Sequence, residues 1–103
     1  KPVEVTDADF DDFVKNNPKV VVDCWAAWCA PCRMLAPTID EIASEKPEIK
    51  FAKLDVDKNR AVPTKYGIMS IPTLLYFKDG KLVDKTLGAL PKAAIESKLA
   101  KLE

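Results

Sequence analysis

Histidine is absent from this sequence and cysteine is scarce, with three cysteines among 103 residues. Without histidine, another side chain must carry any proton transfer near neutral pH. Tetrahedral zinc and iron–sulfur clusters usually take four ligands from cysteine and histidine, so neither is expected. Three cysteines are also too few, and too odd in number, for a secreted scaffold held together by disulfides. Cysteine usage therefore favours a reducing, cytoplasmic setting.

The sequence also lacks an excess of either charge and a long apolar run. Sixteen basic and sixteen acidic residues cancel, so charge gives no reason to expect nucleic acid or an anionic membrane as a partner. No apolar run approaches the roughly 20 residues that span a bilayer. No basic-then-apolar leader opens the chain, and the absence of an initial Met is consistent with a processed or trimmed start. The length predicts one domain, residues 1–103.

The apolar pattern alternates between strand and helix periods along the chain. Nearly unbroken β-branched runs predict buried strands, and apolar residues at helical spacing predict helices. The expected strands are residues 3–5, 19–26, 49–56, 71–77 and 81–87. The expected helices are residues 6–17, 31–46 and 91–102, with a short helix or irregular turn at 58–67. We expect Thr6 to cap the first helix, Pro37 to kink the second, and Asp79-Gly80 to turn a hairpin. This order predicts an α/β fold with a mixed sheet covered by helices on both faces.

Cys29 and Cys32 form a Cys-x-x-C pair where a buried strand gives way to a helix. Residues three apart in a first helical turn share a face, so a small adjustment closes a disulfide there. The free amide groups and the dipole at the helix start favour a thiolate at Cys29. We therefore expect Cys29 to be an exposed nucleophile and Cys32, shielded by the helix, to be the resolving thiol. Haem attachment would need histidine where Arg33 stands, and a static staple of this size would add only about 2 kcal/mol. Redox chemistry is the favoured interpretation.

Asp23 interrupts an otherwise apolar strand just before this pair. A buried carboxylate either keeps its proton or finds a cation, because an unpaired buried charge is costly. One interpretation is a structural ion pair with Lys53 on the neighbouring strand. The other is a group of raised pKa that accepts and returns the proton of the resolving thiol, Cys32. Both interpretations fit the residues.

The segment WCAPC, residues 28–32, resembles the active-site motif of the thioredoxin family, which is usually WCGPC. The resemblance extends over essentially the whole chain, because further segments match in order and spacing. These segments are D-x-W-A at 23–26, Pro37, AKLDVD at 52–57, KYGI at 65–68, IPTLL at 71–75, Asp79-Gly80 and Gly88-Ala89. A Cys-x-x-C pair alone is a weak signal, whereas this ordered set is a strong one.

The resemblance implies a thioredoxin fold of the α/β class, with a central five-stranded mixed β-sheet flanked by four α-helices. It implies that Cys29 attacks, that Cys32 resolves, and that Asp23, with Lys53 beside it, accepts a proton. It also implies that Pro72 is a cis-proline opposite the dithiol, in a loop that pairs with the substrate backbone. The implied substrate-binding residues are Trp28, Ala30, Pro31, Ile71, Pro72 and Gly88.

The activity implied by the resemblance is that of a thiol–disulfide oxidoreductase. Such a protein reduces disulfides in protein substrates, is re-reduced by a separate thioredoxin reductase linked to flavin or ferredoxin, and needs no bound cofactor. The neutral Ala30-Pro31 pair favours a reductase over a thiol oxidase or disulfide isomerase of the same fold. A protein-binding module with an incidental dithiol is the alternative from another class. We expect a monomer.

Three residues depart from the family pattern. Ala30 replaces the usual glycine and is expected to shift the reduction potential, in a direction that the sequence does not reveal. Ala27 replaces a frequent acid, which lowers the negative charge near Cys29. Cys24 replaces a frequent aromatic, and we expect it to be a small buried hydrophobe rather than a regulatory thiol. Of the two tryptophans, Trp25 is expected in the core and Trp28 on the rim of the site.

Overall fold

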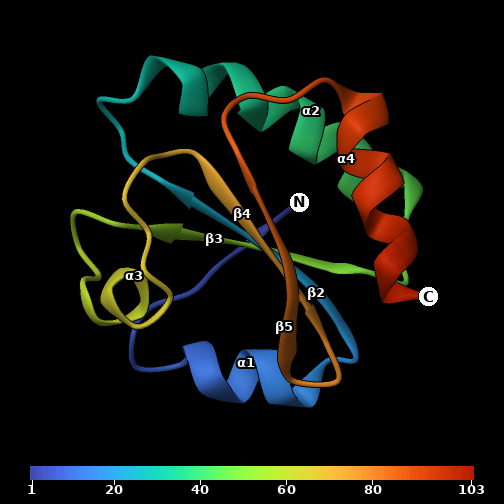
Figure 1. Cartoon of the computed structure of the whole chain (residues 1–103), viewed down its shortest axis with the longest axis horizontal. Helices are drawn as coiled ribbons and strands as arrows, with labels where there is room; N and C mark the ends of the chain where they lie inside the picture. The colour runs from blue at the N-terminus through green and yellow to red at the C-terminus, as the bar shows by residue number, and fades with distance from the viewer.

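The computed structural model describes residues 1–103 and contains one five-stranded sheet with helices on both faces (Figure 1). The strands lie in the order β1-β3-β2-β4-β5. Three of them, β1 (Val3–Glu4), β3 (Lys50–Asp55) and β2 (Lys19–Trp25), run parallel. The last two, β4 (Thr73–Lys78) and β5 (Lys81–Leu87), form an antiparallel hairpin, and β4 is antiparallel to β2. The expected mixed sheet is therefore confirmed.

The helices divide between the two faces of the sheet. They are α1 (Phe10–Asn16), α2 (Ala30–Glu45), α3 (Ala61–Lys65) and α4 (Lys92–Leu99), and α4 continues as a 3-10 turn, η1 (Ala100–Leu102). Figure 1 shows α2 and α4 on one side and α1 and α3 on the other. None of the helices has both the length and the apolar character that a membrane crossing requires.

The alternation of side chains along β2 builds a separate core on each face. Val20, Val22 and Cys24 pack toward α1 and α3, in a cluster with Phe10 of α1. Val21 packs toward α2 and α4, with apolar residues that recur at helical spacing along both helices. Those residues are Leu35, Ile39 and Ile42 of α2 and Ile95 and Leu99 of α4. Since β2 is buried on both faces, its nearly continuous apolar run is explained.

The first helix begins later than expected, and Thr6 does not cap it. The N-cap residue is Asp9, and its carboxylate accepts a 2.7 Å hydrogen bond from the amide of Thr6. Residues 7–9 consequently form a turn instead of a first helical turn. Asp7 instead reaches α3, where its carboxylate oxygens accept the amides of Ala61 at 3.0 Å and Val62 at 2.9 Å. The segment before α1 is thereby tied to the start of α3.

The sheet brings the end of β2 close to the start of β4. Cys24 is paired with Thr73 in the antiparallel register, so the turn that follows β2 faces the loop that precedes β4. The Ile71–Pro72 peptide bond in this loop is cis, as the resemblance implies. Strand β4 begins at Thr73 rather than at the expected residue 71. Helix α2 begins at Ala30, one residue before the expected start, and continues through Pro37. These boundaries place residues 29–32 against residues 71–72.

Candidate active site

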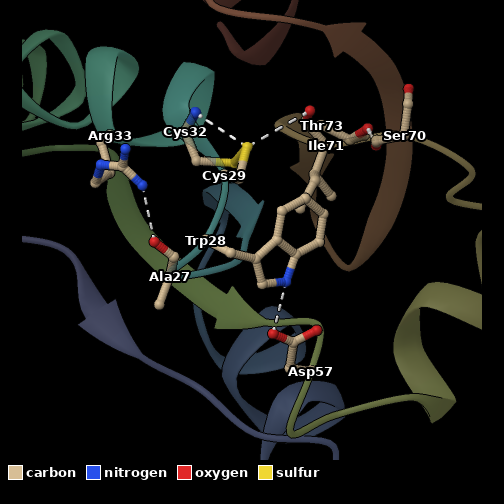
Figure 2. The surroundings of a disulfide bond; sticks show 9 residues. All are labelled: Ala27, Trp28, Cys29, Cys32, Arg33, Asp57, Ser70, Ile71 and Thr73. Atoms are coloured by element: carbon tan, nitrogen blue, oxygen red, sulfur yellow. Dashed lines mark hydrogen bonds between the residues drawn. A yellow bond between two sulfur atoms is a disulfide. The ribbon is translucent and has the colours of Figure 1, made fainter.

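The Cys-x-x-C pair forms a disulfide at the N-terminus of α2 (Figure 2). Cys29 is the N-cap residue, with an extended backbone, and Cys32 lies in the first turn. The Cα atoms of the two residues are 5.2 Å apart, and the amide of Cys32 donates a 3.2 Å hydrogen bond to Cys29 Sγ. Cys29 Sγ also lies 3.8 Å from the carbonyl oxygen of Ile71. The helix start thus directs a backbone donor at Cys29 Sγ.

Both cysteines are buried, and the prediction that Cys29 is exposed is wrong for this disulfide form. Each is 3% exposed. They pack with Ala26 in a small cluster that Ile71 also contacts. The prediction assumed that solvent surrounds the start of α2. The loop before β4, about 40 positions later in the chain, covers it instead.

The two cysteines differ instead in the hollow that each one lines. Cys29 lines an outer groove of about 470 Å³, and Cys32 lines an inner cavity of about 90 Å³. The groove is formed by the turn before α2, the end of β3, α3 and the loop before β4. Its lining residues are Trp28, Cys29, Ala30, Pro31, Val56, Pro63, Ile68, Met69, Ser70 and Ile71. Cys29 and Cys32 therefore differ in the hollow that each one lines, and not in their exposed area.

Most of the expected substrate-binding residues line this groove. Trp28, Ala30, Pro31 and Ile71 do so, and Trp28 is 68% exposed on the rim. Pro72 is a buried residue of the loop before β4, and its carbonyl accepts a 2.8 Å hydrogen bond from the amide of Gly88. Neither Pro72 nor Gly88 lines the groove.

Sequence reasoning missed Met69, which lines the groove, and Asp57, which contacts Trp28 at its rim. Asp57 accepts a 2.9 Å hydrogen bond from Trp28 Nε1, an interaction drawn in Figure 2. Met69 is 95% exposed at the edge of the groove. The signal available in the sequence was IMSI, residues 68–71, which places apolar side chains between the expected turn at 58–67 and the proline at 72. Asp57 carried no such signal, because its partner lies 29 positions away.

Asp23 is buried next to the inner cavity with Lys53, but the two do not form a direct ion pair. They are paired in register on β2 and β3, yet Asp23 Oδ1 has no hydrogen-bond partner. Lys53 Nζ lies over the ring of Trp25, 4.9 Å from its centroid. Burial raises the pKa of Asp23 from 3.8 to about 7, and the charge of Lys53 opposes that rise. Of the two interpretations from the sequence, the group of raised pKa agrees with the structure and the contact ion pair does not.

The inner cavity joins Asp23 and Cys32. It is lined by Asp23, Trp25, Cys32, Arg33, Ala36 and Lys53. A second hollow of about 140 Å³, also lined by Asp23, contacts Lys1, Pro2, Asp40 and Lys53, among others. The inner cavity, of about 90 Å³, has room for about three water molecules. Asp23 and Cys32 therefore line one small cavity.

Cys24 is a free cysteine, and its side chain lies on the face of β2 opposite to that of Asp23. It is fully buried, and burial raises the pKa of its thiol to about 12, with a further rise from the charge of Asp23. A thiol with this pKa is rarely a thiolate at neutral pH. The expectation that Cys24 fills core space is confirmed.

No group of three or more histidine, cysteine, aspartate or glutamate side chains is placed to hold a metal ion.

Comparisons of sequence and of structure found known proteins that are similar to this chain. The family model described as Thioredoxin matches residues 1–101. A thioredoxin from Pyropia yezoensis is 49% identical over 100 residues, which cover 95% of this chain and 94% of that protein. A thioredoxin from Staphylococcus aureus is 48% identical over 100 residues, which cover 96% and 95% of the two chains. Among solved structures, the Plasmodium falciparum thioredoxin is 37% identical with a TM-score of 0.89, over 96% of this chain and 97% of that one. A mutant thioredoxin from Halobacterium salinarum is 34% identical with a TM-score of 0.91, over 99% and 90%.

Proposed function

The chain belongs to the thioredoxin family of thiol–disulfide oxidoreductases, and we propose that it reduces disulfides in protein substrates, with Cys29 attacking and Cys32 resolving. One observation carries this assignment of roles. Cys29 lines the outer groove, whereas Cys32 lines the inner cavity with Asp23. A substrate disulfide can therefore approach Cys29 from the outer groove, whereas Cys32 adjoins the smaller hollow that holds Asp23.

In the first step, the thiolate of Cys29 attacks one sulfur of the substrate disulfide. A mixed disulfide forms, and the other substrate sulfur leaves as a thiolate. The 3.2 Å contact between the Cys32 amide and Cys29 Sγ supports this role, because a backbone donor and the positive end of α2 stabilise negative charge on that sulfur.

In the second step, Cys32 loses its proton and attacks Cys29 Sγ, which releases the second substrate thiol and closes the Cys29–Cys32 disulfide. Asp23 is the proposed proton acceptor. Its pKa of about 7 leaves a large fraction of it ionised at neutral pH, and it shares the inner cavity with Cys32. The charge of Lys53 keeps that pKa from rising further, which supports its place as a positioning residue.

The loop before β4 is the proposed contact for the substrate backbone. The amide and carbonyl groups of Ile71 take part in no backbone hydrogen bond outside the helices and strands, and Ile71 lies next to Cys29 Sγ. An extended substrate segment gains affinity from free main-chain groups of this kind. Pro72 and Gly88 are proposed to hold the loop in place through their 2.8 Å hydrogen bond, while Trp28, Ala30 and Pro31 form the opposite wall.

The partners of this cycle are proposed from the family. They are protein substrates that contain disulfides and a thioredoxin reductase that returns two electrons to the Cys29–Cys32 disulfide. The balanced charge of the chain supports neither nucleic acid nor membrane as a partner. A monomer in a reducing, cytoplasmic setting is the proposed working form.

The direction of electron flow is tested by equilibrating the Cys29–Cys32 couple against glutathione buffers of known potential. We expect a potential at or below roughly −220 mV, near the cytosolic poise. A value well above roughly −180 mV would exclude the reductase direction and favour the oxidase or isomerase alternative.

The assignment of roles is tested by trapping the mixed disulfide with insulin as the protein substrate. Cys32→Ser should accumulate the mixed disulfide and Cys29→Ser should not, while Cys24→Ala serves as the matched control for loss of a cysteine. Accumulation by Cys29→Ser would reverse the roles. If a variant with both Cys29→Ser and Cys32→Ser kept its biological activity, the protein would instead be a binding module.

A further inference from the structure

The solvent-facing sulfur atoms of the disulfide form belong to methionine. The chain contains three cysteines and two methionines. Cys29 and Cys32 are paired and almost fully buried, and Cys24 is inaccessible in the core. Met34 and Met69, by contrast, are 71% and 95% exposed. A peroxide that meets this form of the protein in solution therefore finds two thioethers.

The two methionines differ in where they lie. Met69 lines the outer groove beside Cys29, and it also lines an adjoining hollow of about 240 Å³ that reaches Lys85 and Leu87 of β5. Met34 lies on α2 and lines none of the four hollows of the molecule. A protein docked over Cys29 covers Met69, whereas Met34 is outside the groove.

We propose that Met69 is an oxidation-sensitive contact of the docking groove, and that converting it to the sulfoxide weakens the binding of protein substrates without impairing the dithiol chemistry. Hydrogen peroxide supplies the oxygen: its O–O bond breaks, an S=O bond forms on the thioether, and water leaves. The sulfur is oxidised by two electrons and the peroxide is reduced by two. Methionine sulfoxide reductases reverse this change. The inference rests on the proposed function, because it requires that substrates dock in this groove.

The physical basis is a change in polarity at a surface from which water must be removed when a substrate docks. A thioether is apolar and adapts its shape to different partners. A sulfoxide is strongly polar and chiral, whereas most of the residues that line the groove with Met69 are hydrophobic. Burying a polar group without a partner carries a cost that corresponds to a roughly fivefold or greater loss of affinity. The loss should appear in KM, since the Cys29–Cys32 pair keeps its own contacts with α2 and Ile71.

The test compares Met34→Leu with Met69→Leu, so that each variant has a single methionine. Each protein is treated in its disulfide form with hydrogen peroxide, freed of peroxide, and checked by mass spectrometry for one added oxygen atom. Insulin reduction, driven by dithiothreitol, then gives KM and kcat, and reduction by the protein of a small aromatic disulfide reports the dithiol alone. Each treated variant is compared with its own untreated form.

We expect the treated Met34→Leu protein, with its sulfoxide at Met69, to show KM for insulin raised by roughly fivefold or more. Its rate with the small disulfide should be unchanged, and a methionine sulfoxide reductase should restore KM. The treated Met69→Leu protein should behave like its untreated form. An unchanged KM in treated Met34→Leu, an equal rise in both variants, or failure of Met69 to gain oxygen would overturn the inference. If the untreated wild type failed to reduce insulin, the proposed function itself would fall.

Discussion

Replacing Asp23 with asparagine should remove a specific pH dependence of stability. The pKa of this carboxyl is about 7 in the folded protein against an ordinary value of 3.8. An acid whose pKa is raised by folding holds its proton more tightly in the folded state than in the unfolded chain. Its contribution is therefore complete below about pH 4, is lost as the pH rises toward 7, and does not change further above that.

The magnitude follows from the same two values. The difference between 3.8 and about 7 corresponds to roughly 4 kcal/mol, at about 1.4 kcal/mol per pKa unit. Water entering the two hollows beside Asp23 reduces the penalty for the charge, so we expect a difference of about 2–4 kcal/mol. Asparagine stays neutral at every pH. Its amide adds a constant cost, which cancels when slopes with pH are compared.

The assay is urea unfolding of the disulfide form, followed by circular dichroism at several pH values between 4 and 8. The stability of Asp23→Asn minus that of the wild type should rise by about 2–4 kcal/mol from pH 4 to pH 8. Glu48→Gln, which removes an exposed carboxylate without hydrogen bonds, should follow the wild type within about 0.5 kcal/mol. Parallel profiles of wild type and Asp23→Asn, or a wild type that gains stability relative to the variant as the pH rises, would refute this reasoning.

Three further predictions concern the chemistry, the groove and the fold. In stopped-flow measurements, Asp23→Asn should slow the resolution step by Cys32 about tenfold or more, and it should slow the attack by Cys29 much less. Equal effects on both steps would mean that Asp23 has a structural role only. Trp28→Ala removes the exposed wall of the groove and the partner of Asp57, and should raise KM for insulin roughly fivefold or more; an unchanged KM would place the docking surface elsewhere. Asp7→Ala leaves the amides of Ala61 and Val62 without their acceptor and should lower stability to urea by about 1–2 kcal/mol. Asp12→Ala, an exposed acid in α1, should change stability by no more than about 0.5 kcal/mol, and an equal loss in both variants would deny Asp7 its capping role.

Local chemistry explains most of what the sequence predicted correctly. The strand before Cys29 and the helix after it follow from apolar periodicity, and Cys24 follows from its place in a run buried on both faces. The position of Asp23 in the same run is what identified it as an acid of unusual pKa.

Most of the wrong or missing predictions involve partners far away in the sequence. The coverage of Cys29 by Ile71 joins residues 42 positions apart, and the bonds from Asp7 to α3 span more than 50. Thr6 is an exception, because its partner is local: it has the chemistry of a cap, but its amide donates to the carboxylate of Asp9 and the helix begins only at Phe10. Propensity at a single position does not contain that choice.

The order of the strands has a consequence for synthesis of the chain. β2 lies at the centre of the sheet, yet both of its neighbours, β3 and β4, follow it in the sequence. As the polypeptide leaves the ribosome, the Val20–Val22 run emerges long before β4 does. Until then one edge of this apolar strand lacks its partner, and unpaired edges of this kind are prone to aggregation. We therefore expect the nascent chain to depend on chaperones most while residues 26–72 are emerging from the ribosome, and to lose that dependence once the β4–β5 hairpin has docked.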